Sequence, residues 1–174
     1  MQGYQFDKIF PGCRIIDIHE FLMEKGVRLE QVTGLRYMYH DPCHSPMKVH
    51  EPLKVVNALM GTGVALNTRC CGESGTLATT RPDIPTQVRF RKEEEMRKGA
   101  EALRAEPDGR RYEGGVKILT SCPSCLQGLS RYDDDAGTGA DYIVVEMARQ
   151  ILGEQWMPEY VQRANQGGIE RVLV

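Results

Sequence analysis

Hydrophobic positions recur at helical spacing in several stretches of the chain. Apolar side chains three or four residues apart indicate a helix with one hydrophobic face, and Ile18, Phe21 and Leu22 form such a face in the first stretch. Several stretches end at a glycine, such as Gly26 or Gly61, the residue that most often closes a helix. Helices are predicted over residues 15–25, 51–60, 84–104, 142–152 and 156–165, and a further helix is expected to begin at residues 121–125, where Pro123 suits a first turn.

Short runs of aliphatic and aromatic residues indicate strands between these helices. The polar stretches 106–115 and 133–139 are typical of a loop and a turn. Strands that alternate with helices predict an α/β fold with a mainly parallel sheet flanked by helices. The predicted strands cover residues 35–40, 63–67, 116–120 and 169–174.

The predicted helix over 84–104 is highly charged. Its glutamates at 93–95 lie within one turn of basic residues, which favours a solvated face with stabilising ion pairs. Basic residues in and just before this helix could bind an acidic substrate or partner, but such a stretch is most often only a solvated face. These basic residues are Arg81, Arg89, Arg91 and Lys92.

The composition is that of an ordinary globular protein. The chain has 174 residues, of which 41% are hydrophobic and 26% are charged, enough for one domain with a buried core. Its net charge of -2 gives no electrostatic reason to expect nucleic acid or an anionic membrane as a partner. No apolar run reaches the roughly 20 residues of a membrane span, and residues 1–10 lack the pattern of a secretory signal. We therefore expect a cytoplasmic protein.

Five of the six cysteines fall into three tight groups that are far apart in sequence. The pattern is C-x26-C-C-G-x49-C-x2-C, and Cys13 lies outside it, where we expect it only to pack. Cysteines grouped in this way are typical of a metal or catalytic site and not of disulfides. Each group follows a predicted strand, and the carboxyl ends of parallel strands share one edge of a sheet, so we expect the thiols to face one inorganic centre. The grouped thiols are Cys43, Cys70, Cys71, Cys122 and Cys125.

The adjacent pair Cys70 and Cys71 is the most specific part of this pattern. Neighbouring side chains in an extended segment point opposite ways, so one metal ion seldom binds both, whereas a multinuclear cluster can. Gly72 would let the backbone approach an inorganic core closely. The spacing of Cys122 and Cys125 also serves zinc and redox thiols. Because four thiolates satisfy zinc fully, a structural zinc site is the alternative.

Two histidines flank the first cysteine of the pattern. His40 and His44 could ligate a metal or donate a proton near a cluster sulfur. A ligating histidine would have to displace an available thiolate, so we favour a hydrogen-bonding role at the turn after the strand. His19 and His50 are expected at the surface or at helix ends.

Taken together, these motifs resemble a known family. The sequences YHDPCH at 39–44, CCG at 70–72 and CPSC at 122–125 are similar to the cysteine-rich CCG domain. That domain occurs in the B subunit of heterodisulfide reductase and in the iron–sulfur subunit of glycolate oxidase. The resemblance covers residues 35–130 and is greatest to the C-terminal part of bacterial FAD-linked oxidases of the D-lactate or glycolate dehydrogenase type.

The resemblance implies an iron–sulfur centre and a place in electron transfer. In the family the five-cysteine pattern holds a non-cubane [4Fe-4S] cluster, or a single zinc in some members, which implies that all five grouped cysteines are ligands. The implied function is an electron-transfer domain of an FAD-linked oxidoreductase that acts on a 2-hydroxy acid of the glycolate or lactate type. A zinc domain that docks flavin and cluster domains, or a disulfide-reducing cluster as in heterodisulfide reductase, are the alternatives.

The resemblance also implies partners. A flavin-containing domain or subunit, which holds the FAD, and further iron–sulfur domains are expected beside this chain. Such partners could place it at the inner face of the membrane. The chain, taken as a single domain over 1–174 with a core at 35–152, carries one motif where family members often carry two, and it lacks the ferredoxin-type run of cysteines. We therefore expect an excised or terminal domain that is not catalytically competent alone and that pairs with itself through an exposed interface.

Overall fold

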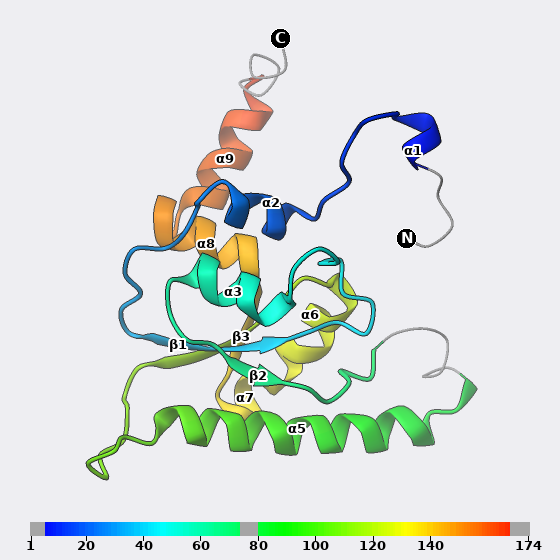
Figure 1. The fold of residues 1–174 in the computed structure, drawn as a ribbon. Coiled ribbons are helices and arrows are strands. Elements are labelled where there is room, and N and C mark those ends of the chain that lie inside the picture. Colours follow the sequence, from blue (N-terminus) through cyan, green and yellow to red (C-terminus); the bar gives the residue numbers. More distant parts are fainter. Residues whose placement is uncertain (1–5, 74–79, 168–174) are drawn as a thin grey trace.

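The structure, a computed structural model, describes residues 6–73 and 80–167. Strands of this part of the chain form one parallel sheet in the order β2-β1-β3-β4 (Figure 1). The predicted α/β class, with a parallel sheet flanked by helices, is confirmed. The strands are β1 (Leu35–His40), β2 (Ala65–Asn67), β3 (Gly115–Thr120) and β4 (Gly139–Tyr142).

Helices connect the strands and cover both faces of the sheet. They lie close to the predicted ranges, except for short elements that the sequence pattern did not indicate. Within the described ranges, no helix has both the length and the apolar character needed to cross a bilayer. The helices are α1 (Phe6–Ile9), α2 (Ile18–Glu24), α3 (Pro52–Met60), α5 (Asp83–Arg104), α6 (Pro123–Leu129), the 3-10 helix η1 (Ser130–Tyr132), α7 (Asp133–Ala136), α8 (Ile143–Leu152) and α9 (Trp156–Asn165).

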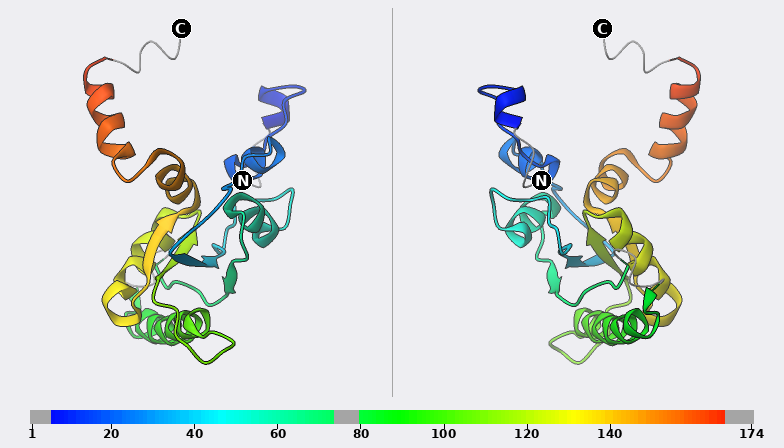
Figure 2. Two further views of the ribbon diagram at one scale, coloured as in Figure 1. Left: turned by 90° about the vertical axis from the view of Figure 1, so that its left-hand side faces the viewer. Right: turned by 90° about the vertical axis from the view of Figure 1, so that its right-hand side faces the viewer.

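The sheet is buried on both faces because successive side chains of a strand point in opposite directions. In β1, Tyr37 and Tyr39 pack with α3 and α8, whereas Met38 packs on the other side with α5 and α6. Figure 2 shows α5 beneath the sheet, on the side opposite α3. A fully buried side chain of this size contributes about 1.5–3 kcal/mol. Two apolar layers therefore hold the ends of the strands in place.

Helix α3 carries local signals at both ends. The carboxylate of Glu51 accepts hydrogen bonds from two backbone N–H groups of the first turn, at 3.0 and 2.6 Å, and Pro52 begins the helix; both features favour a helix start. Gly61 ends the helix with a φ of 63°. A Cβ at this position would lie 2.1 Å from the carbonyl oxygen of Leu29, so only glycine fits there.

The strand order reverses between β1 and β3. β2 follows β1 in sequence and lies on one side of it, while β3 reaches the other side of β1 through the crossover that contains α5. In open α/β sheets, such a topological switch point leaves a crevice at the carboxyl ends of the two strands, where ligands bind. Those ends are His40 of β1 and Thr120 of β3.

The last strand of the sheet differs from the prediction. The turn expected over 133–139 is instead a short helix, α7, closed by Gly137 with a φ of 60°. Residues 139–142 then pair with β3 as β4. This four-residue strand is too short to show an alternating pattern, and it forms because β3 offers it a free edge. The strand predicted over 169–174 lies outside the described residues.

Helix α2 turns a polar face to the interior. Ile18 and Phe21 are 51% and 42% exposed, whereas His19 and Glu20 are buried. His19, expected at the surface or at a helix end, lies at the N-terminal end of α2 with its side chain buried. The carboxylate of Glu20 accepts hydrogen bonds from the backbone N–H groups of residues 49 and 50, both at 2.7 Å. These donors compensate for the burial of its charge and fix the loop that follows β1.

Leu59 tests the packing of α3 on the sheet. Its side chain is fully buried, whereas Leu66 on β2 is 49% exposed. We expect Leu59→Ala to lower the free energy of unfolding by about 2–5 kcal/mol, because it removes apolar contacts and leaves a cavity. The control Leu66→Ala should change it by less than about 0.5 kcal/mol. Denaturant unfolding followed by circular dichroism measures both, and equal effects would contradict this assignment of the core.

Candidate metal centre

The five grouped cysteines all lie just beyond the carboxyl ends of strands. Cys43 follows β1, and Cys70 and Cys71 follow β2. Cys122 follows β3 at the N-terminal end of α6, and Cys125 lies within that helix. Two of the three strands concerned, β1 and β3, border the switch point. The fold therefore brings together three segments that are distant in sequence.

The thiols form two close pairs. The Sγ atoms of the buried Cys71 and Cys125 are 3.3 Å apart, and those of the exposed Cys43 and Cys70 are 4.0 Å apart. Gly72 adopts a φ of 75°, and its backbone N–H donates a hydrogen bond to the Sγ of Cys70 at 3.4 Å. The site thus has a closed side and an open side.

Electrostatic interactions join the two pairs and include the fifth thiol. Burial raises the pKa of Cys43, and the negative charges of Cys70 and Cys71 raise it further. The pKa of Cys125 is raised by its hydrogen bond to Cys71, by burial and by the neighbouring Cys122. The two pairs are therefore electrostatically coupled, and Cys122 acts on the buried pair through Cys125.

Cys71 is a grouped thiol whose pKa is lowered, so it ionises readily. The hydrogen bond with Cys125 lowers the pKa of Cys71 to about 4, and His40 contributes in the same direction against the effect of burial. The thiolate is the form of cysteine that binds metals. Cys13, in contrast, is exposed ahead of α2, so the expectation that it packs in the interior is wrong.

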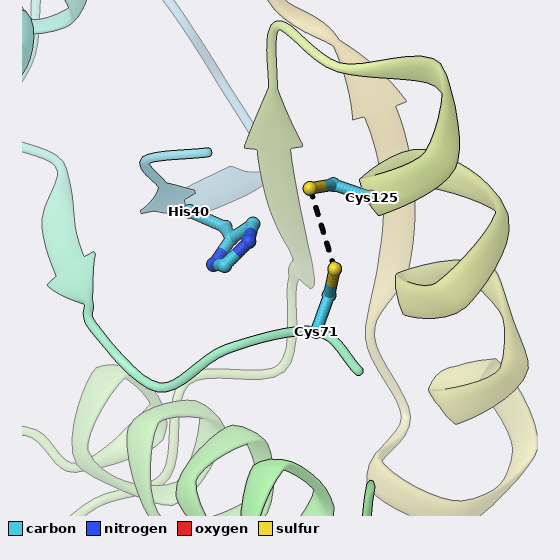
Figure 3. A group of neighbouring side chains, drawn as sticks. All are labelled: His40, Cys71 and Cys125. Atoms are coloured by element: carbon cyan, nitrogen blue, oxygen red, sulfur yellow. Dashed lines mark hydrogen bonds between the residues drawn. The ribbon is translucent and has the colours of Figure 1, made fainter. Parts of the chain in front are cut away.

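His40 lies at the end of β1 and is only 1% exposed. Figure 3 shows its imidazole ring facing Cys71 and Cys125, and the potential ligand atoms of these three residues lie within 4.8 Å of one another. Its Nδ1 is 3.2 Å from the Nζ of Lys92, while its buried Nε2 makes no hydrogen bond of regular geometry. His44 is exposed in the loop beyond β1. Of the two histidines, the structure brings only His40 to the buried thiols.

Lys92 departs from the expectation that its stretch of α5 is solvated. Its side chain is fully buried, so the interpretation of this lysine as part of a charged surface is wrong. Lys92, Met96 and Ala100 are spaced by four residues and together form the buried stripe of α5. That spacing is the signal in the sequence that could have identified the lysine as an interior residue.

The Nζ of Lys92 is surrounded by polar groups. Besides His40, it donates hydrogen bonds to the carbonyl oxygen of Arg69 at 2.7 Å, to the carboxylate of Glu95 at 3.1 Å and to the Oδ1 of Asn67. Burial lowers the pKa of Lys92, while Glu95 and the nearby thiolates raise it. Glu95 also accepts a hydrogen bond from the backbone N–H of Arg69 at 3.0 Å. These contacts fasten the segment after β2 to α5.

Glu73 fastens the other end of the same segment. Its carboxylate pairs with Arg89 of α5 at 3.0 Å and with Arg131 of η1 at 2.8 Å. Gly128 of α6 passes so close that a Cβ there would lie 2.3 Å from the Cγ of Glu73 and 3.5 Å from the carbonyl oxygen of Cys71. The absence of a side chain at this position therefore lets α6 approach the segment that carries the adjacent cysteines.

A cavity of about 410 Å³ opens beside Cys70, one of the two exposed thiols. Charged side chains dominate its wall, and several of them are exposed to solvent. This opening gives a small molecule or a partner surface access to the outer side of the site. The residues that line it are Arg69, Cys70, Val88, Arg91 and Glu94.

The donor set fits a metal ion or a metal–sulfur group. Clustered thiolates are the ligands that zinc and iron–sulfur clusters prefer. Four of the thiols come together in two close pairs, with Sγ atoms 3.3 and 4.0 Å apart, which is the donor chemistry that such a group requires. Ligation by the five grouped cysteines stays a prediction.

This fold and this site define a class of protein, an α/β domain with a multi-thiol centre at the switch point of a parallel sheet. The family model described as "Cysteine-rich domain" (CCG) matches residues 37–130, more than half of the chain. The chain therefore belongs to the CCG cysteine-rich domain family, and the resemblance drawn from its motifs is confirmed. A second model, described as a domain of unknown function (DUF3400), matches residues 130–174.

Two curated relatives are similar to this chain. The B subunit of a fumarate reductase (CoM/CoB) from Methanothermobacter marburgensis is 31% identical over 134 residues, which cover 72% of this chain and 24% of the relative. A protein described as an uncharacterized iron–sulfur protein from Methanocaldococcus jannaschii is 27% identical over 114 residues, which cover 63% of this chain and 20% of the relative. The chain thus spans about a quarter of the length of these relatives or less. No solved structure matches it.

Gly128 tests whether close approach of α6 is needed to assemble the site. Gly128→Ala should force Glu73 away from Arg131 and displace the adjacent backbone, because Glu73 is pinned by two arginines. We expect a loss of about 1–3 kcal/mol in the free energy of unfolding and a lower metal content after loading. The control Gly63→Ala, where a Cβ meets nothing within 4 Å, should change neither. Thermal unfolding and metal analysis would show this, and an unaffected Gly128→Ala variant would contradict it.

Proposed function

We propose that this chain is an iron–sulfur-binding electron-transfer domain of an oxidoreductase. The single observation that supports this most directly is the two close pairs of thiols, which bring four of the five grouped cysteines together from three strand ends. Family membership and the similarity to a reductase subunit and to an iron–sulfur protein support the same function. The bound cluster would supply one-electron transfer, which no amino-acid side chain of the site provides by itself.

The positions of the adjacent cysteines favour a multinuclear cluster over a single ion. Cys70 lies beside Cys43 on the exposed side, whereas Cys71 lies beside Cys125 on the buried side. One tetrahedral ion is satisfied by four donors around a single point. A cluster has several irons and can accept thiolates from both sides at once. We therefore propose the non-cubane [4Fe-4S] type, with all five grouped cysteines as ligands.

The finer proposal concerns the oxidoreductase to which the domain belongs. By family resemblance, a flavin in a neighbouring domain or subunit would oxidise a 2-hydroxy acid of the glycolate or lactate type and deliver electrons to this site. The length of the curated relatives, four to five times the matched segment, supports neighbouring domains. In this proposal the protein works in the cytoplasm, with any contact to the membrane made by its partners.

A second candidate function is reduction of a disulfide at the cluster. The observation that favours it is the cavity beside Cys70, which is lined by Arg69 and Arg91 and gives a substrate access to the exposed thiols. Electron transfer to a partner protein needs only an exposed side of the site, whereas a disulfide substrate needs a cavity to bind in. The cavity is therefore the feature that favours the second function. Turnover of a small disulfide by the reduced, reconstituted protein would support this candidate.

Anaerobic reconstitution with ferrous iron and sulfide tests the proposed cluster. We expect about four irons per chain and a charge-transfer absorption in the visible range. Cys71→Ser should lose most of the bound iron, because it removes the most acidic thiol of the buried pair. Cys13→Ser, which changes an exposed thiol outside the five grouped cysteines, is the matched control and should bind as the native chain does. Iron and sulfide near zero in the native chain would refute the proposal.

The adjacent pair also separates a cluster from a structural zinc site. A zinc ion that uses only one thiol of the pair should survive either Cys70→Ser or Cys71→Ser. A cluster that uses both should lose metal in each variant. Metal analysis of protein prepared without oxygen measures this difference, and zinc at one equivalent in one of the two variants would favour the zinc site.

A further inference from the structure

Lys92 and His40 form a buried pair behind the thiols. Both side chains are essentially inaccessible, and the Lys92 Nζ lies 3.2 Å from the His40 Nδ1. The other neighbours of this Nζ are oxygen acceptors, namely an amide, a carbonyl and the carboxylate of Glu95. Three such acceptors around one nitrogen, one of them charged, favour the ammonium form of lysine.

The ammonium of Lys92 determines the tautomer of His40. An ammonium group has three donors and no lone pair, so it cannot accept a hydrogen bond from a protonated Nδ1. An Nδ1 at 3.2 Å from this cation is therefore unprotonated and shares the donors of Lys92 with the three oxygen acceptors. A neutral imidazole has one proton, which then resides on Nε2. Figure 3 shows that the ring faces Cys71 and Cys125, so the remaining N–H is directed at sulfur.

The same tautomer excludes His40 as a metal ligand. A histidine that binds a metal through Nε2 carries its proton on Nδ1, where it donates to a carboxylate or a carbonyl. At His40 the group beside Nδ1 is instead the cation of Lys92. If Nδ1 carried the proton, its N–H would face the N–H groups of the lysine, and neither could accept. The compact group of His40, Cys71 and Cys125 is therefore not a three-ligand metal site.

We propose that Lys92 is a positioning residue that fixes His40 as a hydrogen-bond donor to the sulfur of Cys71. The effect of this pair on a midpoint potential rests on the proposed function, because it requires a bound cluster. The assignment of the His40 tautomer does not require one. Hydrogen bonds to ligand sulfur and nearby positive charge stabilise the more negative, reduced form of a cluster. The pair of Lys92 and His40 should therefore raise the midpoint potential.

The midpoint potential of the reconstituted protein tests the role of Lys92. We expect Lys92→Met to lower it by a shift equivalent to about tenfold in the reduction equilibrium, ~59 mV for one electron. The control Lys98→Met makes the same substitution on the same helix, at a side chain that is 73% exposed and pairs with Glu94, and it should give only a small fraction of that shift. An unchanged potential in Lys92→Met with a full iron content would overturn the proposal.

Two substitutions of His40 separate a donor from a ligand. His40→Gln keeps an N–H group near the position of Nε2, and His40→Leu removes it. If His40 donates, both variants should retain iron, the glutamine variant should keep a potential close to that of the native chain, and the leucine variant should have a lower potential. Loss of iron in both variants would mean that His40 is a ligand and would overturn the proposal.

The tautomer can be measured without any cluster. Long-range 1H–15N correlation spectra of the reduced, metal-free chain report which ring nitrogen carries the proton, and the His40 signals are assigned by their absence in His40→Gln. We expect the Nε2–H form in the native chain and a mixture with the Nδ1–H form in Lys92→Met. The Nδ1–H form in the native chain would overturn the inference. A chain that fails to assemble a cluster would refute the proposed function, yet this measurement would still decide the tautomer.

Discussion

The site depends on the parallel arrangement of β1, β2 and β3. Parallel strands carry their carboxyl ends to one edge, and the reversal of strand order between β1 and β3 opens a crevice at that edge. Thiols that are 27 and 54 residues apart in sequence thereby come within 4.0 and 3.3 Å of each other. The two apolar layers that clamp the sheet fix this edge. A loss of packing far from the cysteines would consequently loosen the site as well.

Two buried charges, Glu146 and Lys92, have different roles in this structure. Glu146 is fully buried but is compensated by the hydroxyl of Tyr37, by Lys117 and by Arg149 at 2.7–2.8 Å, on the face that carries α8. That network joins structural elements only. Lys92 is also compensated, yet it additionally contacts a histidine that faces sulfur. Burial of an ammonium costs several kcal/mol before compensation, so its position beside the site is more informative than that of a surface lysine.

Much of the fold could be predicted from the sequence because strong local signals coincide with it. Glu51, Pro52 and Gly61 delimit α3, and the apolar run of β1 ends where Pro42 interrupts it. The strand β4 could not be predicted, since its four residues depend on pairing with β3 and not on their own pattern. The approach of Gly128 to Glu73 is likewise a tertiary contact that no local pattern reveals. The grouping of the cysteines could be recognised in the sequence, whereas their division into a buried and an exposed pair could not be predicted from it.

The division of the thiols into a buried and an exposed pair gives the proposed centre two different sides. Cys71 and Cys125 lie in the same apolar cluster as Met96 and Leu129, where a low dielectric strengthens every charge interaction. Cys43 and Cys70 face solvent, and an open cavity lies beside Cys70. Tuning groups such as the Lys92 and His40 pair act on the buried side, where water does not screen them. Electrons from a partner would then enter and leave on the exposed side. The adjacent residues Cys70 and Cys71 would connect this side, which meets the partner, to the buried side, which sets the reduction potential.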